Sequence, residues 1–227
     1  MSTLPAYKCE FIEFMARAGV LTFGEFKTKS GRLSPYFVNT GNYRTGAQIA
    51  KLGDYYASCY MDKVGKPTDT LYGPAYKGIP LVVAAATSLY RNHGMDIPFC
   101  FNRKEAKTHG EGGVMIGRAP QNGDSIVIVE DVITAGTALR ETMEILKHEA
   151  GDVKIEALII QVDRMERATG QLSAVQQAQQ DFGIAVHSIV TVRDIMQHMY
   201  NREIDGKVLL TDEVKAKMEQ YIAEYGV

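Results

Sequence analysis

Ile126-Val-Ile-Val-Glu-Asp-Val-Ile-Thr-Ala-Gly-Thr137 is the stretch that decides the fold of this chain. Its first four residues are all β-branched, which is typical of a strand covered on both faces in a parallel sheet. Glu130 and Asp131 follow where this strand ends, and Gly136 supplies backbone freedom for a tight turn. The apolar pattern over 138–146 then predicts a helix. The stretch therefore predicts a strand, a turn and a helix, with two carboxylates at the junction.

The same junction is suited to a ligand. Open α/β sheets bind ligands at the carboxyl ends of their strands, and backbone amides at the start of a helix attract phosphate. Glu130 and Asp131 would hold hydroxyl groups, but they would repel a bare phosphate. A phosphorylated sugar offers hydroxyls and a phosphate together, so the stretch indicates a ligand of that class. The alternative interpretation is an ordinary strand, turn and capped helix.

The composition is that of a soluble globular protein with one domain: 227 residues, 45% hydrophobic and 23% charged. A net charge of -2 and a pI near 6.2 argue against general nucleic-acid binding. The three cysteines lack metal-ligand or CxxC spacing, which favours reduced thiols and a cytoplasmic location without structural zinc. The longest apolar run, 79–86, is too short to span a bilayer, and no signal peptide is evident. We therefore expect neither a nucleic acid nor a membrane as a partner.

Short apolar runs alternate with helical patterns from Asp69 onward, which implies βαβ units and a mainly parallel sheet flanked by helices. Ahead of them, a helix over 8–18 and a hairpin over 21–40 suggest a small N-terminal hood, so that residues 1–227 form a single domain with a hood mainly from about 1–40. The further predicted strands are 70–72, 97–101, 125–129, 155–162 and 185–190, and the further helices are 45–62, 77–91, 137–149, 192–200 and 211–225. The polar stretch 169–182 could be a solvated helix face.

A basic, glycine-bearing loop is predicted over 102–113. Arg103, Lys104, Lys107 and His109 precede Gly110-Glu-Gly-Gly113. Glycines make large backbone movements less costly, so the loop could close its cations over an anionic ligand and exclude water. The alternative is a solvated basic loop with no ligand.

Gly73-Pro-Ala-Tyr-Lys-Gly-Ile-Pro80 forms a second strand-to-helix connection. Lys77 falls at the expected start of the helix, where a pyrophosphate could lie. A Pro/Gly turn with an exposed lysine explains the same residues.

Two further groups could bind a planar anion. The hairpin carries Lys29, Arg32, Tyr36 and Phe37, a mixture of cations and aromatic rings that alternatively packs the hood. Arg164 follows a predicted strand and could bind a carboxylate bidentately, unless it forms a surface pair with Asp163.

These motifs resemble those of the type I phosphoribosyltransferases. Val129-Glu-Asp-Val-Ile-Thr-Ala-Gly-Thr137 is similar to the family's motif for PRPP, 5-phosphoribosyl 1-diphosphate. The strings at 26–37, 73–78 and 102–113 resemble the orotate phosphoribosyltransferase family in particular. The resemblance implies the type I phosphoribosyltransferase fold. It also implies transfer of the 5-phosphoribosyl group from PRPP to orotate, a pentosyltransferase step of pyrimidine (UMP) biosynthesis that gives orotidine 5'-monophosphate and pyrophosphate.

The resemblance also implies roles for individual residues. Glu130 and Asp131 would bind the ribose hydroxyls, and the 5-phosphate would lie against 134–138. The full set for PRPP is Lys29, Tyr76, Lys77, Arg103, Lys104, Lys107, His109, Glu130, Asp131, Val132, Ile133, Thr134, Ala135, Gly136, Thr137 and Ala138. The set for orotate is Lys29, Phe37, Val38, Thr134 and Arg164.

The catalytic residues implied by the resemblance are Lys107, Arg103, Lys104 and His109. Their loop reaches the neighbouring subunit's site in this family, which implies a homodimer with composite active sites. Magnesium (Mg²⁺) would be bound mainly through PRPP, with no direct protein ligand. Family members often have two aspartates where this chain has Glu130-Asp131, and an aromatic residue where it has Val38.

Overall fold

A six-stranded sheet lies at the centre of the computed structural model, which describes residues 4–28, 31–107, 113–133, 136–168 and 170–227. The side chains of 106, 107 and 113 lie outside this description. The strand order is β5-β4-β3-β6-β7-β8, and all neighbouring pairs are parallel except β4 with β5. The strands are β3 (Thr70–Tyr72), β4 (Phe99–Lys107), β5 (Gly113–Gly117), β6 (Ser125–Val129), β7 (Lys154–Asp163) and β8 (Ala185–Thr191).

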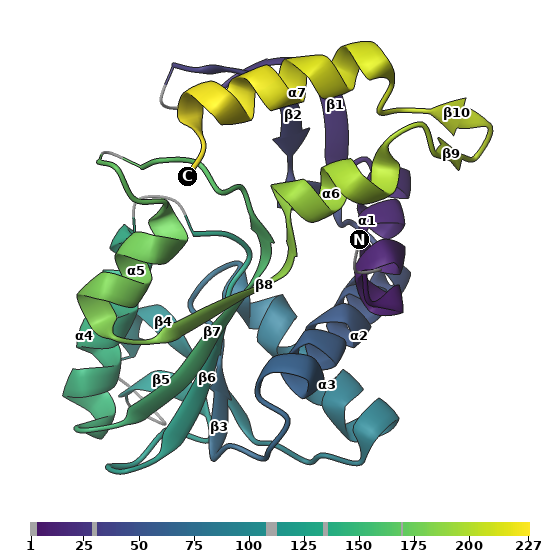
Figure 1. Ribbon diagram of the computed structural model, residues 1–227. Helices are drawn as coiled ribbons and strands as arrows, with labels where there is room; N and C mark the ends of the chain where they lie inside the picture. Colours follow the sequence, from purple (N-terminus) through teal and green to yellow (C-terminus); the bar gives the residue numbers. More distant parts are fainter. Residues whose placement is uncertain (1–3, 29–30, 108–112, 134–135, 169) are drawn as a thin grey trace.

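Helices cover both faces of this sheet (Figure 1). One face packs against α1 (Ala6–Arg17), α2 (Gly46–Lys63) and α3 (Gly78–His93), and the other against α4 (Thr137–Ala150) and α5 (Ala174–Phe182). Alternate residues of β6 enter the two cores: Val127 and Val129 the first, Ile126 and Ile128 the second. This alternation confirms the predicted strand with two buried faces.

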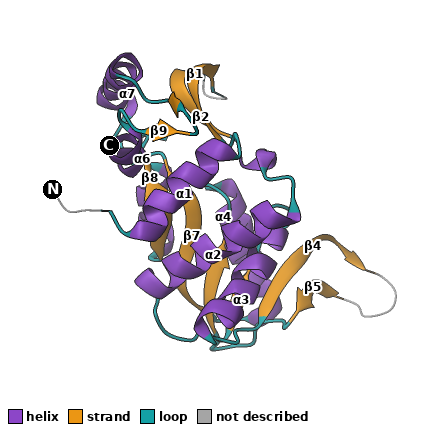
Figure 2. Ribbon diagram, turned by 90° about the vertical axis from the view of Figure 1, so that its right-hand side faces the viewer, coloured by secondary structure: helices purple, strands orange, loops and turns teal. Residues whose placement is uncertain are grey.

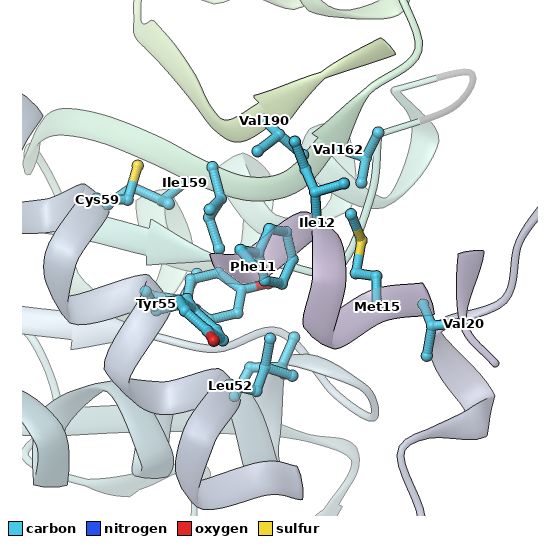
Figure 3. Packing of buried hydrophobic residues seen from close by; sticks show 14 of the residues in the cluster. Phe11, Ile12, Met15, Val20, Leu52, Tyr55, Cys59, Ile159, Val162 and Val190 are labelled. Carbon is cyan, nitrogen blue, oxygen red and sulfur yellow. The ribbon is translucent and has the colours of Figure 1, made fainter. Parts of the chain in front are cut away.

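The first core is closed by aromatic contacts between α1 and α2. The Phe11 ring lies 5.1 Å from that of Tyr55, and both rings are buried. Figure 3 shows Phe11 and Ile12 directed into this cluster, with Ile12 beside Val190. The start of α2 is fixed by a capping box, in which the Thr45 side chain and Gln48 bond each other's backbone amides.

The strand order creates a crevice between β3 and β6. From β3 the chain passes through α3 to β4 on one side, and it later returns to place β6 on the other side of β3. Ligands bind at such a switch point, outside the carboxyl ends of the strands. The loops that meet there are 73–77 after β3 and 130–133 after β6.

A separate antiparallel hairpin forms the hood, as predicted. It consists of β1 (Leu21–Lys27) and β2 (Leu33–Val38), followed by the short 3-10 helix η1 (Thr40–Asn42). The C-terminal helix α7 (Asp212–Tyr225) lies across the hairpin and contacts β2, after α6 (Val192–Met199) and the small pair β9 (Glu203–Ile204) and β10 (Lys207–Val208) (Figure 1). The hood therefore includes the C-terminal helix. The sequence did not predict this part of the hood, because helical periodicity predicts a helix but not the distant strand that it covers.

One expectation needs correction. Residues 102–107, predicted as the first half of a flexible loop, continue strand β4 and pair with β5, with Asn102 opposite Met115 and Lys107 opposite Gly113. In Figure 2 the two strands extend as an arm beyond the helices. Because this part of the arm is rich in charged residues and lies outside the core, it has no apolar alternation from which a strand could be predicted.

In the part of the chain that the structure describes, no helix is both long enough and apolar enough to cross a membrane.

We predict that Gly53→Ala destabilises the protein although Gly46→Ala in the same helix does not. A Cβ at Gly53 would lie 2.6 Å from the Ala84 carbonyl oxygen of α3, whereas a Cβ at Gly46 would meet nothing within 4 Å. Alanine favours the helix at both positions, so only the clash distinguishes them. Urea unfolding should show a loss of about 1–3 kcal/mol for Gly53→Ala and no loss for Gly46→Ala. Equal stability of the two variants would contradict this account of the α2–α3 contact.

Candidate active site

Three separate elements meet at the Asp131 carboxylate. Asp131 follows β6 and is only 6% exposed. Its Oδ2 accepts hydrogen bonds from Lys77 Nζ at 2.7 Å and from Thr40 Oγ1 at 2.8 Å. Lys77 is the N-cap residue of α3 and Thr40 begins η1, so this single oxygen joins the two crevice loops to the hood.

The two neighbouring carboxyl groups have opposite electrostatic character. Burial raises the pKa of Glu130 to about 8, and the Asp131 carboxylate also favours the protonated form. Burial acts on Asp131 in the same direction, but the bonds from Lys77 and Thr40 outweigh it and hold the pKa of Asp131 below its usual value. The crevice thus combines a carboxyl group whose ionised form is favoured with one whose protonated form is favoured.

The backbone beneath these carboxyl groups is held at several points. The Tyr56 hydroxyl donates to the Glu130 carbonyl oxygen at 2.7 Å, and the Glu130 amide donates to the Ile159 carbonyl oxygen at 3.0 Å. The backbone amide of Gln161 donates to the Asp131 carbonyl oxygen at 3.0 Å. Both carboxyl groups are therefore mounted on the rigid end of the sheet.

The start of α4 lies beside the same crevice. Gly136 has a φ of +73°, as expected for the predicted turn, and is the N-cap residue of α4; among the described residues no side chain caps the helix. A pocket lies here, lined by residues from the β6 end and from α4: Pro74, Ile128, Glu130, Val132, Ile133, Gly136, Ala138, Leu139, Thr142 and Leu158. Uncapped amides and the positive end of the helix dipole suit an anion. Thr134 and Ala135 lie outside the described residues.

The loop after β3 is fixed by a buried asparagine of β4. Asn102 is 5% exposed, and its Oδ1 accepts from the Tyr72 hydroxyl and from the Ala75 amide, both at 2.9 Å. The following peptide bond, Ala75–Tyr76, is cis. Tyr76 is 71% exposed, and Lys77 lies at the crevice.

The predicted cations of 102–113 lie on or beyond the β4–β5 arm. Arg103 and Lys104 belong to β4, and the backbone of Lys107 pairs with Gly113. His109 lies outside the described residues. The described part of the chain gives no contact between Lys104 and either crevice carboxyl group, so their cooperation stays a prediction.

The residues predicted for a planar anion fall into two groups. Arg164 follows β7, as expected, but the alternative surface pair with Asp163 is wrong, because Arg164 Nη2 lies 2.7 Å from Glu166 Oε1. Phe37 stacks on Phe26, with ring centroids 5.5 Å apart, and half-buried Val38 packs against the main core. Lys29 lies outside the described residues.

Sequence reasoning missed three residues that hold the site in place: Thr40, Tyr56 and Asn102. A polar residue directly after an apolar run was the available signal for Asn102, which follows Phe99-Cys-Phe101. Thr40 and Tyr56 act through contacts with residues 91 and 74 positions away, and no local pattern reports such contacts.

Comparison with known proteins gives concordant results. A family model for the phosphoribosyl transferase domain matches residues 40–170. Proteins named orotate phosphoribosyltransferase are similar along nearly the whole chain. One from Clostridium beijerinckii is 49% identical over 98% of this chain and 99% of its own length. One from Photobacterium profundum is 47% identical, covering 99% and 100%.

A crystal structure of orotate phosphoribosyltransferase from Francisella tularensis is similar in three dimensions. It has a TM-score of 0.82 and 39% sequence identity, and the match covers 96% of this chain and 100% of that one. The similarity therefore includes the hood and the C-terminal region as well as the central sheet.

We predict that Glu130→Gln changes how stability depends on pH. The pKa of Glu130 rises from 4.5 to about 8 on folding, so the folded protein retains a proton that the unfolded chain has lost. Between those values, ionisation of the unfolded chain lowers the free energy of unfolding by up to about 1.4 kcal/mol per pH unit. Glutamine cannot ionise, so the variant should gain stability relative to wild type as the pH rises.

Urea unfolding without ligand at pH 5, 6.5, 8 and 9 measures this difference. The exposed Glu144→Gln is the control and should follow wild type at every pH. Parallel profiles for Glu130→Gln and wild type would contradict the raised pKa.

Proposed function

This chain belongs to the orotate phosphoribosyltransferase family, and from this premise we propose that its β3–β6 crevice transfers the 5-phosphoribosyl group of PRPP to orotate. The products are orotidine 5'-monophosphate and pyrophosphate. One observation carries the proposal: the Lys77–Asp131 pair lies at the end of β6, from which the chain leads to α4, and no side chain of the described residues caps the start of that helix. A cation, a hydroxyl-binding carboxylate and a phosphate site thus follow one another along the crevice.

The two carboxyl groups bind the ribose. Ionised Asp131 accepts a hydrogen bond from one ribose hydroxyl, and protonated Glu130 donates one to the other. The ribose hydroxyls replace Lys77 as a donor to Asp131, which frees the Lys77 ammonium for the diphosphate. The 5-phosphate lies at 134–138, where the helix amides neutralise its charge.

The reaction is a displacement at the anomeric carbon. A ring nitrogen of orotate forms the new bond while the bond to the diphosphate breaks, so the reaction needs no nucleophilic side chain. Positive charge develops on the ribose and negative charge on the leaving group. Positioning and electrostatic stabilisation therefore supply most of the rate enhancement. The cations of the arm, Arg103, Lys104, Lys107 and His109, stabilise the diphosphate and help to exclude water.

Magnesium, when bound together with PRPP, would neutralise charge on the diphosphate. Among the described residues no cluster of three or more histidine, cysteine, aspartate or glutamate side chains could hold a metal ion. Magnesium commonly binds through one or two carboxylates and substrate phosphates, so a dedicated protein cage is not needed. Glu130 and Asp131 would act on the metal only through the ribose hydroxyls that they bind.

We place the homodimer interface on an exposed apolar stripe along α3. Tyr76, Val83 and Tyr90 are 71%, 36% and 61% exposed. Val83 and Tyr90 lie seven residues, about two helical turns, apart on one face of α3, and Tyr76 lies just before the helix. An exposed stripe of large apolar residues favours contact with another protein surface. In the homodimer, the adjacent β4–β5 arm reaches the partner's crevice and makes each site composite.

The proposed enzyme acts in the reducing cytoplasm. Cys9, Cys59 and Cys100 are free thiols, and such thiols persist in that compartment. Neither a nucleic acid nor a membrane is among the proposed partners.

An orotate absorbance assay tests the proposed function. The purified protein should remove orotate only when both PRPP and Mg²⁺ are present, and hypoxanthine in excess should not displace orotate. A folded protein without turnover, or one that prefers the purine, would contradict the proposal.

Lys107→Ala should lower kcat by about 100-fold or more and raise KM for PRPP by less than about 5-fold, because its contact forms chiefly in the transition state. Lys147→Ala, at the far end of α4, is the control and should retain full activity. A variant that lost affinity for PRPP and kept kcat would contradict the catalytic role.

Mixing chains tests whether the sites are composite. Asp131→Asn and Lys107→Ala should each be inactive alone, but hybrid dimers should contain one intact site. Random reassociation should therefore restore about a quarter of wild-type activity. Absence of recovery, in samples shown to exchange subunits, would contradict shared sites.

A further inference from the structure

The guanidinium of Arg164 is held by a carboxylate two residues along the chain. Arg164 Nε donates to Glu166 Oε1 at 2.9 Å, and Nη2 lies 2.7 Å from the same oxygen. Both side chains are largely buried. One edge of the planar guanidinium is therefore occupied by Glu166, and among the described residues Nη1 has no partner.

Residues of the hood also contact the Arg164–Glu166 pair. The Tyr36 hydroxyl donates to Glu166 Oε1 at 3.0 Å, and the Arg164 guanidinium lies 4.9 Å from the centre of the Tyr36 ring. Arg32 Nη1 lies 3.9 Å from Glu166 Oε2. A single residue of β2 thus contacts both members of the pair, which restricts how Arg164 can turn.

A backbone turn brings Glu166 onto Arg164. Met165 has a φ of +52°, an uncommon conformation for a residue other than glycine. Its amide donates to Asp163 Oδ1 at 2.8 Å, which stabilises the turn. Unusual backbone conformations of this kind persist where the surroundings enforce them.

The C-terminal segment supplies that enforcement. The Val227 amide donates to the Met165 carbonyl oxygen at 3.0 Å, and the Arg167 amide donates to the Tyr225 carbonyl oxygen at 2.8 Å. Glu166 and Gly226 form an antiparallel bridge between these bonds. The end of the chain therefore pairs with the segment that follows Arg164.

We propose that Glu166 is a positioning residue for the base: it holds one edge of Arg164 so that Nη1 faces the crevice and receives an anionic group of orotate. The inference rests on the proposed function, in which Arg164 binds orotate. An arginine already fixed in its binding orientation loses less side-chain freedom when the ligand arrives.

Glu166 and the turn at Met165 lie inside the segment shared with other phosphoribosyl transferases, but two of the parts that support them lie outside it. The family model matches residues 40–170, whereas Tyr36 and the segment 225–227 flank it on either side. The two flanking segments meet over Arg164 in the fold. The hood and the C-terminal segment therefore both support the arginine that is proposed to bind the base.

Steady-state kinetics with Glu166→Ala and Glu166→Gln tests the inference. Glu166→Ala frees Arg164 and should raise KM for orotate by about 10-fold, with KM for PRPP changed by less than about 2-fold. Glutamine keeps an oxygen that accepts from Arg164 and Tyr36, so Glu166→Gln should stay within about 3-fold of wild type for both substrates.

Glu156→Ala is the matched control. Glu156 lies at the opposite end of β7, is similarly buried and also pairs with cations, Lys66 at 3.2 Å and Lys154 at 2.8 Å. It should leave both KM values unchanged. If Glu166→Ala does not fold, the Tyr36→Phe variant tests the inference instead. Loss of the Tyr36 hydrogen bond to Glu166 should raise KM for orotate by about 2-fold or more and leave KM for PRPP unchanged.

Several results would overturn the inference. These are an unchanged KM for orotate in Glu166→Ala, equal rises for both substrates, or a glutamine variant as impaired as the alanine variant. An unchanged KM for orotate in Tyr36→Phe would overturn it where the alanine variant does not fold. Wild-type protein that fails to use orotate would instead refute the proposed function, so the two failures are distinguishable.

Discussion

The Asp131 carboxylate is the constraint on which the site depends. Its Oδ2 receives both the Lys77 ammonium and the Thr40 hydroxyl, and so links the loop after β3, the loop after β6 and the hood. The sheet makes this possible because β3 and β6 are adjacent although β4 and β5 separate them along the chain. Without the reversal in strand order, these polar groups would not share one crevice.

Burial affects the pKa values of the two adjacent carboxyl groups differently. Asp131 remains ionised because cationic and hydroxyl donors compensate for its lost solvation, whereas the pKa of Glu130 is raised by burial without comparable compensation. Two full negative charges at this position would repel a phosphorylated ligand more strongly than one. A crevice with one acceptor and one protonated carboxyl group is better suited to a ribose that arrives with two phosphate groups.

The sequence predicts those parts of the molecule whose signal is local. The β-branched run 126–129 and the turn at Gly136 identify β6 and the start of α4, and both are confirmed. The continuation of β4 to Lys107 and its pairing with β5 could not be predicted, since charged residues outside the core show no apolar period. Glu166 was missed for another reason, because its role depends on a turn at Met165 and on contacts with both ends of the chain.

A crystal structure with PRPP and Mg²⁺ bound would show directly whether the crevice at Asp131 binds the ribose of PRPP. We expect the ribose hydroxyls to contact Asp131 and Glu130, the 5-phosphate to lie at the start of α4, and Lys77 to leave Asp131 for the diphosphate. An intact Lys77–Asp131 pair, with the ribose and its 5-phosphate bound elsewhere, would contradict it.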